Sequence, residues 1–76
     1  MAQFFFDLQE DGSVLLDREG VDLADAQQAE LKAWQTACDI AKDNAGQRSR
    51  SIKILVRDQH AEILAVELNA TVLAKR

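Results

Sequence analysis

Residues 25–46 read DAQQAELKAWQTACDIAKDNAG, and this stretch decides the fold. No proline or glycine interrupts it between Asp25 and Gly46, so a helix can run its full length. Asp25 and Gln28 have the spacing of a capping box, and Gly46 is suited to the position just after a helix. We therefore expect one long amphipathic helix over residues 26–45.

The apolar side of this helix forms a broad arc at 100° per residue. A small edge would let the backbone approach a sheet closely, and a larger edge would fill the wider gap beside it. The small edge consists of Ala29, Ala33, Ala37 and Ile40, and the larger edge of Leu31, Trp34, Cys38 and Ala41.

A β-hairpin is expected before the helix. Residues 3–9 alternate in polarity, with Phe4, Phe6 and Leu8 on one face. Asp11-Gly12 is a strong turn signal between this strand and a second one at residues 13–17. Residues 17–20 (DREG) then predict another turn, after which Val21 and Leu23 should tuck under the domain.

A second hairpin is expected after the helix, with strands at residues 51–58 and 62–68 and a tail at 69–76. A loop of Gln59, His60 and Ala61 would require a left-handed residue near Ala61, where alanine costs about 1 kcal/mol relative to glycine. This loop would place six large apolar residues on one face in the pairs Ile52–Leu68, Ile54–Val66 and Val56–Leu64.

Together these elements predict a single α+β domain over residues 1–76. The architecture is two-layered, of order ββαββ, with a four-stranded antiparallel sheet and one long amphipathic helix on one face. Strand order across the two hairpins stays open at this stage.

Composition narrows the class of protein. The 76 residues are 47% hydrophobic with a net charge of −4, and the only cysteine is Cys38. An acidic chain argues against nonspecific nucleic-acid binding, and a lone cysteine excludes an intrachain disulfide. With neither a signal peptide nor a run of membrane-spanning length, we expect a cytoplasmic protein that binds no membrane.

Several segments resemble a family of short, mostly alphaproteobacterial proteins that share a domain of unknown function. The resemblance covers nearly the whole chain and implies no activity, cofactor or catalytic residue. Family members often have histidine where this chain has Asp7 and glycine where it has Ala61. The matching segments are Phe4-Phe5-Phe6, Asp11-Gly12, Asp17-Arg18-Glu19-Gly20-Val21, Leu23-Ala24-Asp25 and residues 52–58.

A pattern-level likeness is to antitoxins of bacterial toxin–antitoxin pairs. Their partial ribonuclease-H-like domain also begins with a hairpin turned at Asp-Gly and continues into a helix. This likeness implies an antitoxin-like partner protein, although a shared fold alone does not fix function.

Candidate catalytic and metal-binding residues are few. His60 lies at a hairpin tip, where it is better explained as part of the turn than as a general base. Cys38 lies in the helical arc, where a thiol serves mainly as a small hydrophobe. The acidic residues of the two N-terminal turns lack the spacing of a calcium-binding loop. We therefore expect no cofactor and no metal, and we do not expect an enzyme.

Basic residues concentrate between the helix and the third strand. Arg48 and Arg50 are expected in a loop, and Lys53 and Arg57 on the sheet face away from the helix. Phe5 could add a stacking surface there, which would suit a nucleic acid or another anion. A solvated face with cross-strand pairs, such as Arg57 near Glu62, is the simpler interpretation.

The same open face should also carry apolar residues, which one covering helix would leave in water. Such a strip usually marks an interface, and two copies of it can meet about a two-fold axis. We therefore predict a non-enzymatic protein-interaction module, either a homodimer or bound to another protein, with the nucleic-acid binder as the alternative. The predicted interface is Phe5, Leu15, Leu55, Ile63 and Ala65.

Overall fold

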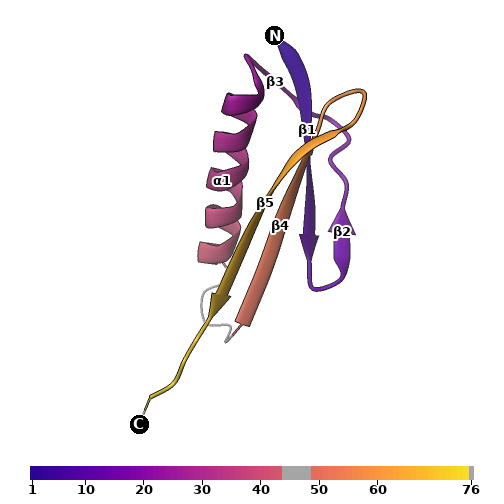
Figure 1. The fold of residues 1–76 in the computed structure, drawn as a ribbon. Helices are drawn as coiled ribbons and strands as arrows, with labels where there is room; N and C mark the ends of the chain where they lie inside the picture. The colour runs from indigo at the N-terminus through magenta and orange to yellow at the C-terminus, as the bar shows by residue number, and fades with distance from the viewer. Residues whose placement is uncertain (44–48, 76) are drawn as a thin grey trace.

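The fold of this computed structural model is α+β, as predicted, with one helix packed on an antiparallel sheet (Figure 1). The structure describes residues 1–43 and 49–75. The sheet has the order β2-β1-β4-β5, and β3 also pairs with β1. The elements are β1 (Ala2–Glu10), β2 (Ser13–Leu15), β3 (Val21–Leu23), α1 (Ala26–Asp43), β4 (Ser49–Arg57) and β5 (Glu62–Thr71).

The strand β3 was not predicted. Val21 and Leu23 do not tuck under the domain, because β3 pairs antiparallel with the start of β1, with Val21 opposite Phe4. Strand β2 pairs with the end of β1 and stops at Leu15, two residues before the predicted end. Residues 16–20 separate β2 from β3, so that one edge of β1 is covered by two short strands with a turn between them.

The turn between β1 and β2 is the predicted Asp11-Gly12. Both residues have positive φ, 47° for Asp11 and 83° for Gly12, and Glu10 pairs with Ser13 across them. Positive φ at both central positions is the requirement of a type I′ turn, whose twist matches that of the flanking strands. The Asp-Gly signal is thus confirmed.

The register between β4 and β5 is also confirmed, with Ile52 opposite Leu68, Ile54 opposite Val66 and Val56 opposite Leu64. The predicted loop geometry is wrong, however, because Ala61 does not have positive φ. A register shift after Val56 places Arg57 opposite Glu62 and lengthens the loop to residues 58–61. In this loop the Asp58 carboxylate accepts hydrogen bonds from the backbone N–H groups of His60 and Ala61.

The core lies between α1 and the sheet. Ala29, Ala33 and Ala37 are fully buried against Ile52, Ile54 and Val56 of β4, as predicted for the small edge of the helix. Burying each of the larger side chains contributes on the order of 1.5–3 kcal/mol. Phe4 and Val66 complete this buried cluster.

The start of α1 is capped as the sequence predicts. The Asp25 carboxylate accepts a hydrogen bond from the Gln28 backbone N–H, a contact that typically stabilises a helix by about 1 kcal/mol. The described helix ends at Asp43, and the predicted continuation to Ala45 and Gly46 lies outside the described residues.

At the other end of the chain, β5 extends to Thr71, three residues beyond the predicted strand. The tail at 72–75 follows it without regular structure.

The larger edge of the helix does not enter the core. Leu31 and Trp34 are each 52% exposed, and Cys38 is exposed as well. The physical reason is the position of α1, which packs equally on β4 and β5. Since β5 is the last strand of the sheet, no further strand within residues 1–43 and 49–75 lies beneath that side of the helix.

Candidate functional site

A buried carboxylate lies on the sheet face away from the helix. Asp7 is only 5% exposed, although α1 packs on the other face of the sheet. Its carboxylate accepts a hydrogen bond of 2.7 Å from Nε of Arg57 on β4 and one of 2.9 Å from the backbone N–H of Asp17. Arg57 in turn donates from Nη2 to the Asp17 carbonyl oxygen at 2.8 Å. Asp7, Asp17 and Arg57 thus form a closed polar cluster.

Asp17 supports the interrupted edge of β1. Its carboxylate accepts hydrogen bonds from the backbone N–H groups of Phe6, Glu19 and Gly20 at 3.0–3.1 Å. Strand β3 pairs with the start of β1 and β2 pairs with its end, and Phe6 lies between these two paired stretches. The backbone N–H of Phe6 therefore donates to the Asp17 carboxylate instead of to a neighbouring strand. The Asp17 carboxylate therefore accepts the hydrogen bond that a backbone carbonyl of a neighbouring strand would otherwise accept.

The charges of the polar cluster are mutually stabilised. Burial raises the pKa of Asp7, but hydrogen bonds from Arg57 and from the Asp17 backbone outweigh burial and leave the pKa below its usual value. Burial likewise raises the pKa of Asp17, and its three backbone hydrogen bonds reverse this shift to a lowered pKa. The hydrogen bond to Asp7 raises the pKa of Arg57. All three groups stay ionised at neutral pH.

Phe5 is covered by this cluster. The Arg57 guanidinium carbon lies 4.5 Å from the centroid of the Phe5 ring, in a cation–π contact. On another side of the ring, a Cβ added to Gly20 would come within 2.9 Å of Phe5 Cε2, and Gly20 has φ of 75°. The ring of Phe5 is therefore half-buried between Arg57 and the turn, where a nucleic-acid base could not stack on the side that Arg57 occupies.

The predicted interface residues are not brought together as one strip. Leu15 pairs with Leu8, and directly opposed residues share a face, so Leu15 lies on the helix side of the sheet and its predicted placement is wrong. Leu55 is half-buried, whereas Ile63 and Ala65 are exposed and line a shallow hollow with Leu55. Of the predicted strip, only Leu55 of β4 and Ile63 and Ala65 of β5 lie together.

The predicted anion patch is divided between the two faces. Arg50 lies in β4 rather than in a loop and forms ion pairs with Glu10 and Asp11. Because residues of one strand alternate, Arg50 faces the helix side, whereas Lys53 and Arg57 face the other side. Arg57 lies opposite Glu62, as predicted, and is held by Asp7. Arg48 lies outside the described residues.

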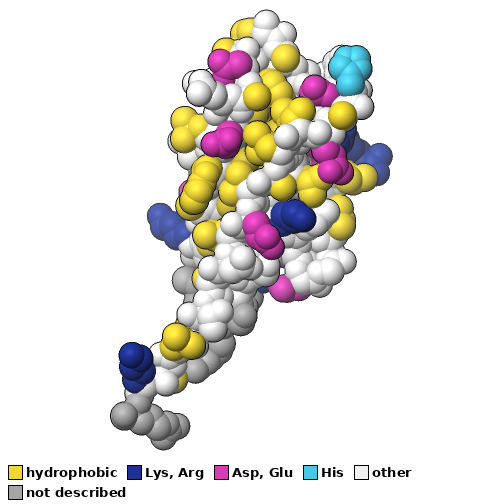
Figure 2. All heavy atoms as spheres, in the orientation of Figure 1, with side chains coloured by type: hydrophobic (Ala, Val, Ile, Leu, Met, Phe, Trp, Pro, Cys, Tyr) yellow, Lys and Arg dark blue, Asp and Glu magenta, His cyan; other side chains and the backbone are white. Residues whose placement is uncertain are grey.

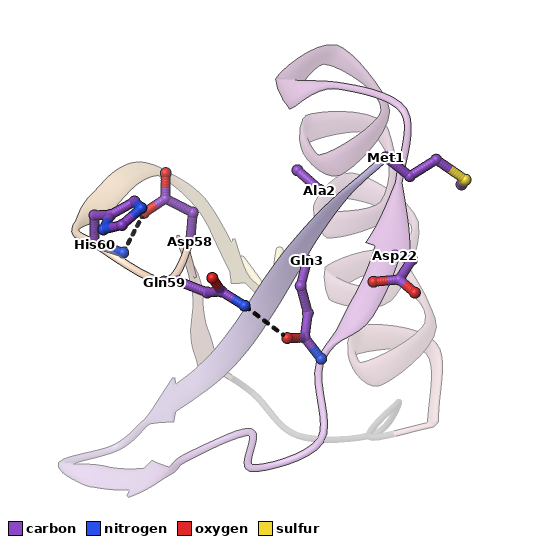
Figure 3. Close-up of a pocket in the computed structure, with 7 residues that line it drawn as sticks. All are labelled: Met1, Ala2, Gln3, Asp22, Asp58, Gln59 and His60. Carbon is purple, nitrogen blue, oxygen red and sulfur yellow. Dashed lines mark hydrogen bonds between the residues drawn. The ribbon is translucent and has the colours of Figure 1, made fainter.

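His60 lines a shallow hollow at the start of β1 (Figure 3). A hydrogen bond between the side chains of Gln59 and Gln3 crosses the hollow. Asp22 lies on one side of Gln3 in Figure 3, and Asp58 and His60 lie on the other. The Asp58 carboxylate accepts a hydrogen bond from the backbone N–H of His60, and Asp22 lies across Gln3 from both residues.

The remaining candidates for a chemical role are the cysteine thiol and the acidic residues. Cys38 is a free, exposed thiol and not the core residue that was predicted. Within residues 1–43 and 49–75, no group of three or more His, Cys, Asp or Glu side chains is placed to hold a metal ion. The same residues include no helix with the length and hydropathy needed to cross a membrane.

A surface that the sequence did not predict lies along α1 and β5. Figure 2 shows hydrophobic side chains gathered over the upper part of the helix and the neighbouring strand. We define the α1–β5 surface as Leu31, Trp34 and Cys38 of α1 together with the free edge of β5. Hydrophobic periodicity finds these helix residues but assigns them to the core, because it cannot tell which side of a helix a sheet covers.

Comparison with known proteins places the chain in a family. The model of a Domain of unknown function (DUF6894) matches residues 3–69, so the chain belongs to this family. No curated protein and no solved structure matches the chain.

Proposed function

We propose that the protein is a non-enzymatic protein-interaction module that binds its partner through the α1–β5 surface. The observation that carries this proposal is the half exposure of Trp34 and Leu31 beside a free strand edge. Exposed apolar groups on a small domain commonly mark a contact with another protein, and aromatic residues are enriched at the centres of such contacts. An antitoxin-like partner protein is one form that such a module could take.

The arrangement of polar groups supports binding rather than catalysis. In the described residues, Asp7, Asp17 and Arg57 hold one another and two backbone segments. Of the three, Asp17 borders a shallow hollow, and its carboxylate there is already held by backbone N–H groups. The nucleic-acid alternative depends on basic groups that carboxylates already hold, since Arg50 pairs with Glu10 and Arg57 with Asp7. An apolar contact with a protein therefore requires less rearrangement of the surface.

The test is capture of partners by the tagged protein in cells that naturally express it, with and without nuclease. A Leu31→Gln, Trp34→Gln double variant should lose the captured protein while remaining folded at the temperature of the assay, because both side chains are half exposed and only part of their buried area is lost. Gln35→Glu, at an exposed position on another side of the helix, is the matched control and should retain capture. Capture that the double variant retains, or that nuclease abolishes, would overturn the proposal.

A further inference from the structure

The free edge of β5 lacks most of the features that usually protect an edge strand, although it carries the charged residues Glu62 and Glu67. Natural edges are shortened, bulged, or given lysine or proline to prevent pairing with another chain. Strand β5 is ten residues long, reads EILAVELNAT and contains neither lysine nor proline. Its register shift with β4 lies beside its first residue, which leaves the rest of the strand regular.

The exposed apolar residues of α1 lie on the same side as this edge. The connection from β3 through α1 to the parallel strand β4 belongs to a type that is almost always right-handed. With that handedness and 100° per residue, Trp34 is turned toward β5 and away from β1, whereas Cys38 and Leu31 lie further round in the same direction, toward solvent. Figure 2 shows groups of hydrophobic side chains over the upper part of α1 and of the strand beside it.

We propose that this surface binds a second copy of the same chain, with β5 paired antiparallel to its counterpart about a two-fold axis. This inference rests on the proposed function and names its partner. The pairing would extend the sheet continuously through both copies and place the two helices side by side on one face. The two apolar helix sides would then cover each other.

The spacing of the elements fits this arrangement. Paired strands lie about 4.8 Å apart, so the axis passes about 2.4 Å outside β5. α1 contacts both β4 and β5, and a helix axis midway above these two strands would lie about 2.4 Å inside β5. The two helix axes would then be about 9.6 Å apart, within the roughly 8–10 Å of packed helices.

The sequence of β5 is complementary to itself in one register. Opposed residues share a face, so the two helices lie on the same side only if some residue of β5 lies directly opposite its own counterpart, with the axis midway between them. An axis at Glu67 would oppose the two Glu67 carboxylates. An axis at Val66 pairs nine of the ten residues and places Glu67 opposite Ala65 of the second copy and Leu64 opposite Leu68. We therefore assign the axis to Val66.

A charge test at Ala65 examines this register. Ala65 is exposed, and in the dimer it would face Glu67 twice, once on each side of the axis. Ala65→Lys should tighten the dimer and Ala65→Glu should weaken it, each by about two- to thirty-fold, the range expected for two cross-strand charge pairs. Sedimentation equilibrium from micromolar to millimolar protein measures both constants. The single tryptophan provides a second reading, because Trp34 emission should shift to shorter wavelength as the dimer forms.

The outcomes separate this inference from the proposed function. A dimer that the two substitutions shift in opposite directions supports the pairing. A dimer that responds to neither overturns it, as does a protein that stays monomeric at millimolar concentration. If such a monomer still captures a partner that the Leu31→Gln, Trp34→Gln variant loses, the interaction module stands and self-pairing fails. A monomer without any partner overturns both.

Discussion

The two edges of the sheet are completed in opposite ways. At the β1 edge, the chain covers itself with β2 and β3, and the Asp17 carboxylate accepts the Phe6 N–H in the gap between them. At the β5 edge, a longer and uninterrupted strand has no neighbouring strand in the part of the chain that the structure describes, and it lies on the side toward the exposed Trp34. The first edge therefore depends on a few polar residues, and we propose that the second depends on another molecule.

This difference separates residues that hold the fold from residues that we propose take part in binding. Substitutions at the β1 edge should lower the free energy of unfolding at any protein concentration, because they break contacts within the chain. Substitutions at the β5 edge should act on association instead.

The largest effect on stability is expected for Asp17→Ala. Three backbone N–H groups would lose a charged acceptor, and hydrogen bonds to charged groups contribute about 1.5–3 kcal/mol each before water replaces some of them. We expect a loss of about 3 kcal/mol in urea-induced unfolding. Asp22→Ala is the matched control, because Asp22 is an exposed residue of β3, and it should change stability by less than about 0.5 kcal/mol. Equal effects of the two substitutions would refute the role of Asp17.

Gly20→Ala should be the next most damaging change, at about 2 kcal/mol. The added Cβ would adopt an unfavourable positive φ and would also approach Phe5 Cε2 to 2.9 Å. Gly12→Ala isolates the backbone contribution, because Gly12 also has positive φ but no atom lies within 4 Å of an added Cβ. The comparison of the two melting temperatures gives the cost of the contact with Phe5, and a larger loss for Gly12→Ala would contradict it.

Acid should weaken the β1 edge without removing any side chain, so its effect should be smaller than that of either substitution. The pKa values of Asp7 and Asp17 are lowered in the folded protein from an ordinary value of 3.8. Their stabilising contribution is therefore fully present above about pH 4 and is lost as the pH falls through the folded pKa values. Urea titrations between neutral pH and pH 2 should show this decline. A smaller decline is expected in Asp17→Asn, and an unchanged one would exclude Asp17 as a source.

The smallest effect is expected for Ala61→Gly, in the loop that leads into β5. Because Ala61 does not have positive φ, glycine relieves no strain there and only adds freedom to the unfolded chain. We expect a loss of about 0.5–1 kcal/mol, and the sequence-based prediction had the opposite sign. A higher melting temperature for the variant would instead support the prediction that Ala61 is strained.

Local signals in the sequence were sufficient for much of the fold. Asp11-Gly12, Asp25 and the alternation of Ile52, Ile54 and Val56 each specify their own element, and the structure agrees with all of them. The turn Asp17–Gly20 was predicted, but its role was not, because that role depends on Phe6 and on contacts across the sheet.

The candidate surfaces were harder to predict for the same reason. The face of Leu15 depends on the pairing of Leu8 with it, and the exposure of Trp34 depends on β5 being the last strand. Neither strand order nor the position of the helix over it is encoded in a local pattern. Arg57 was placed on the correct face, yet its partner Asp7 lies 50 residues away, beyond the reach of any spacing rule.

That same separation bears on how fast the protein folds. The β1–β2 and β4–β5 hairpins close over short loops and can form early, whereas the central pairing of β1 with β4 must close a loop through the whole helix. Non-local pairing of this kind slows folding. The contact between Asp7 and Arg57 forms only when β1 and β4 meet, and we expect its removal to speed unfolding more than it slows the formation of either hairpin. The buried Asp7 carboxylate would then slow unfolding and so lengthen the lifetime of the folded state.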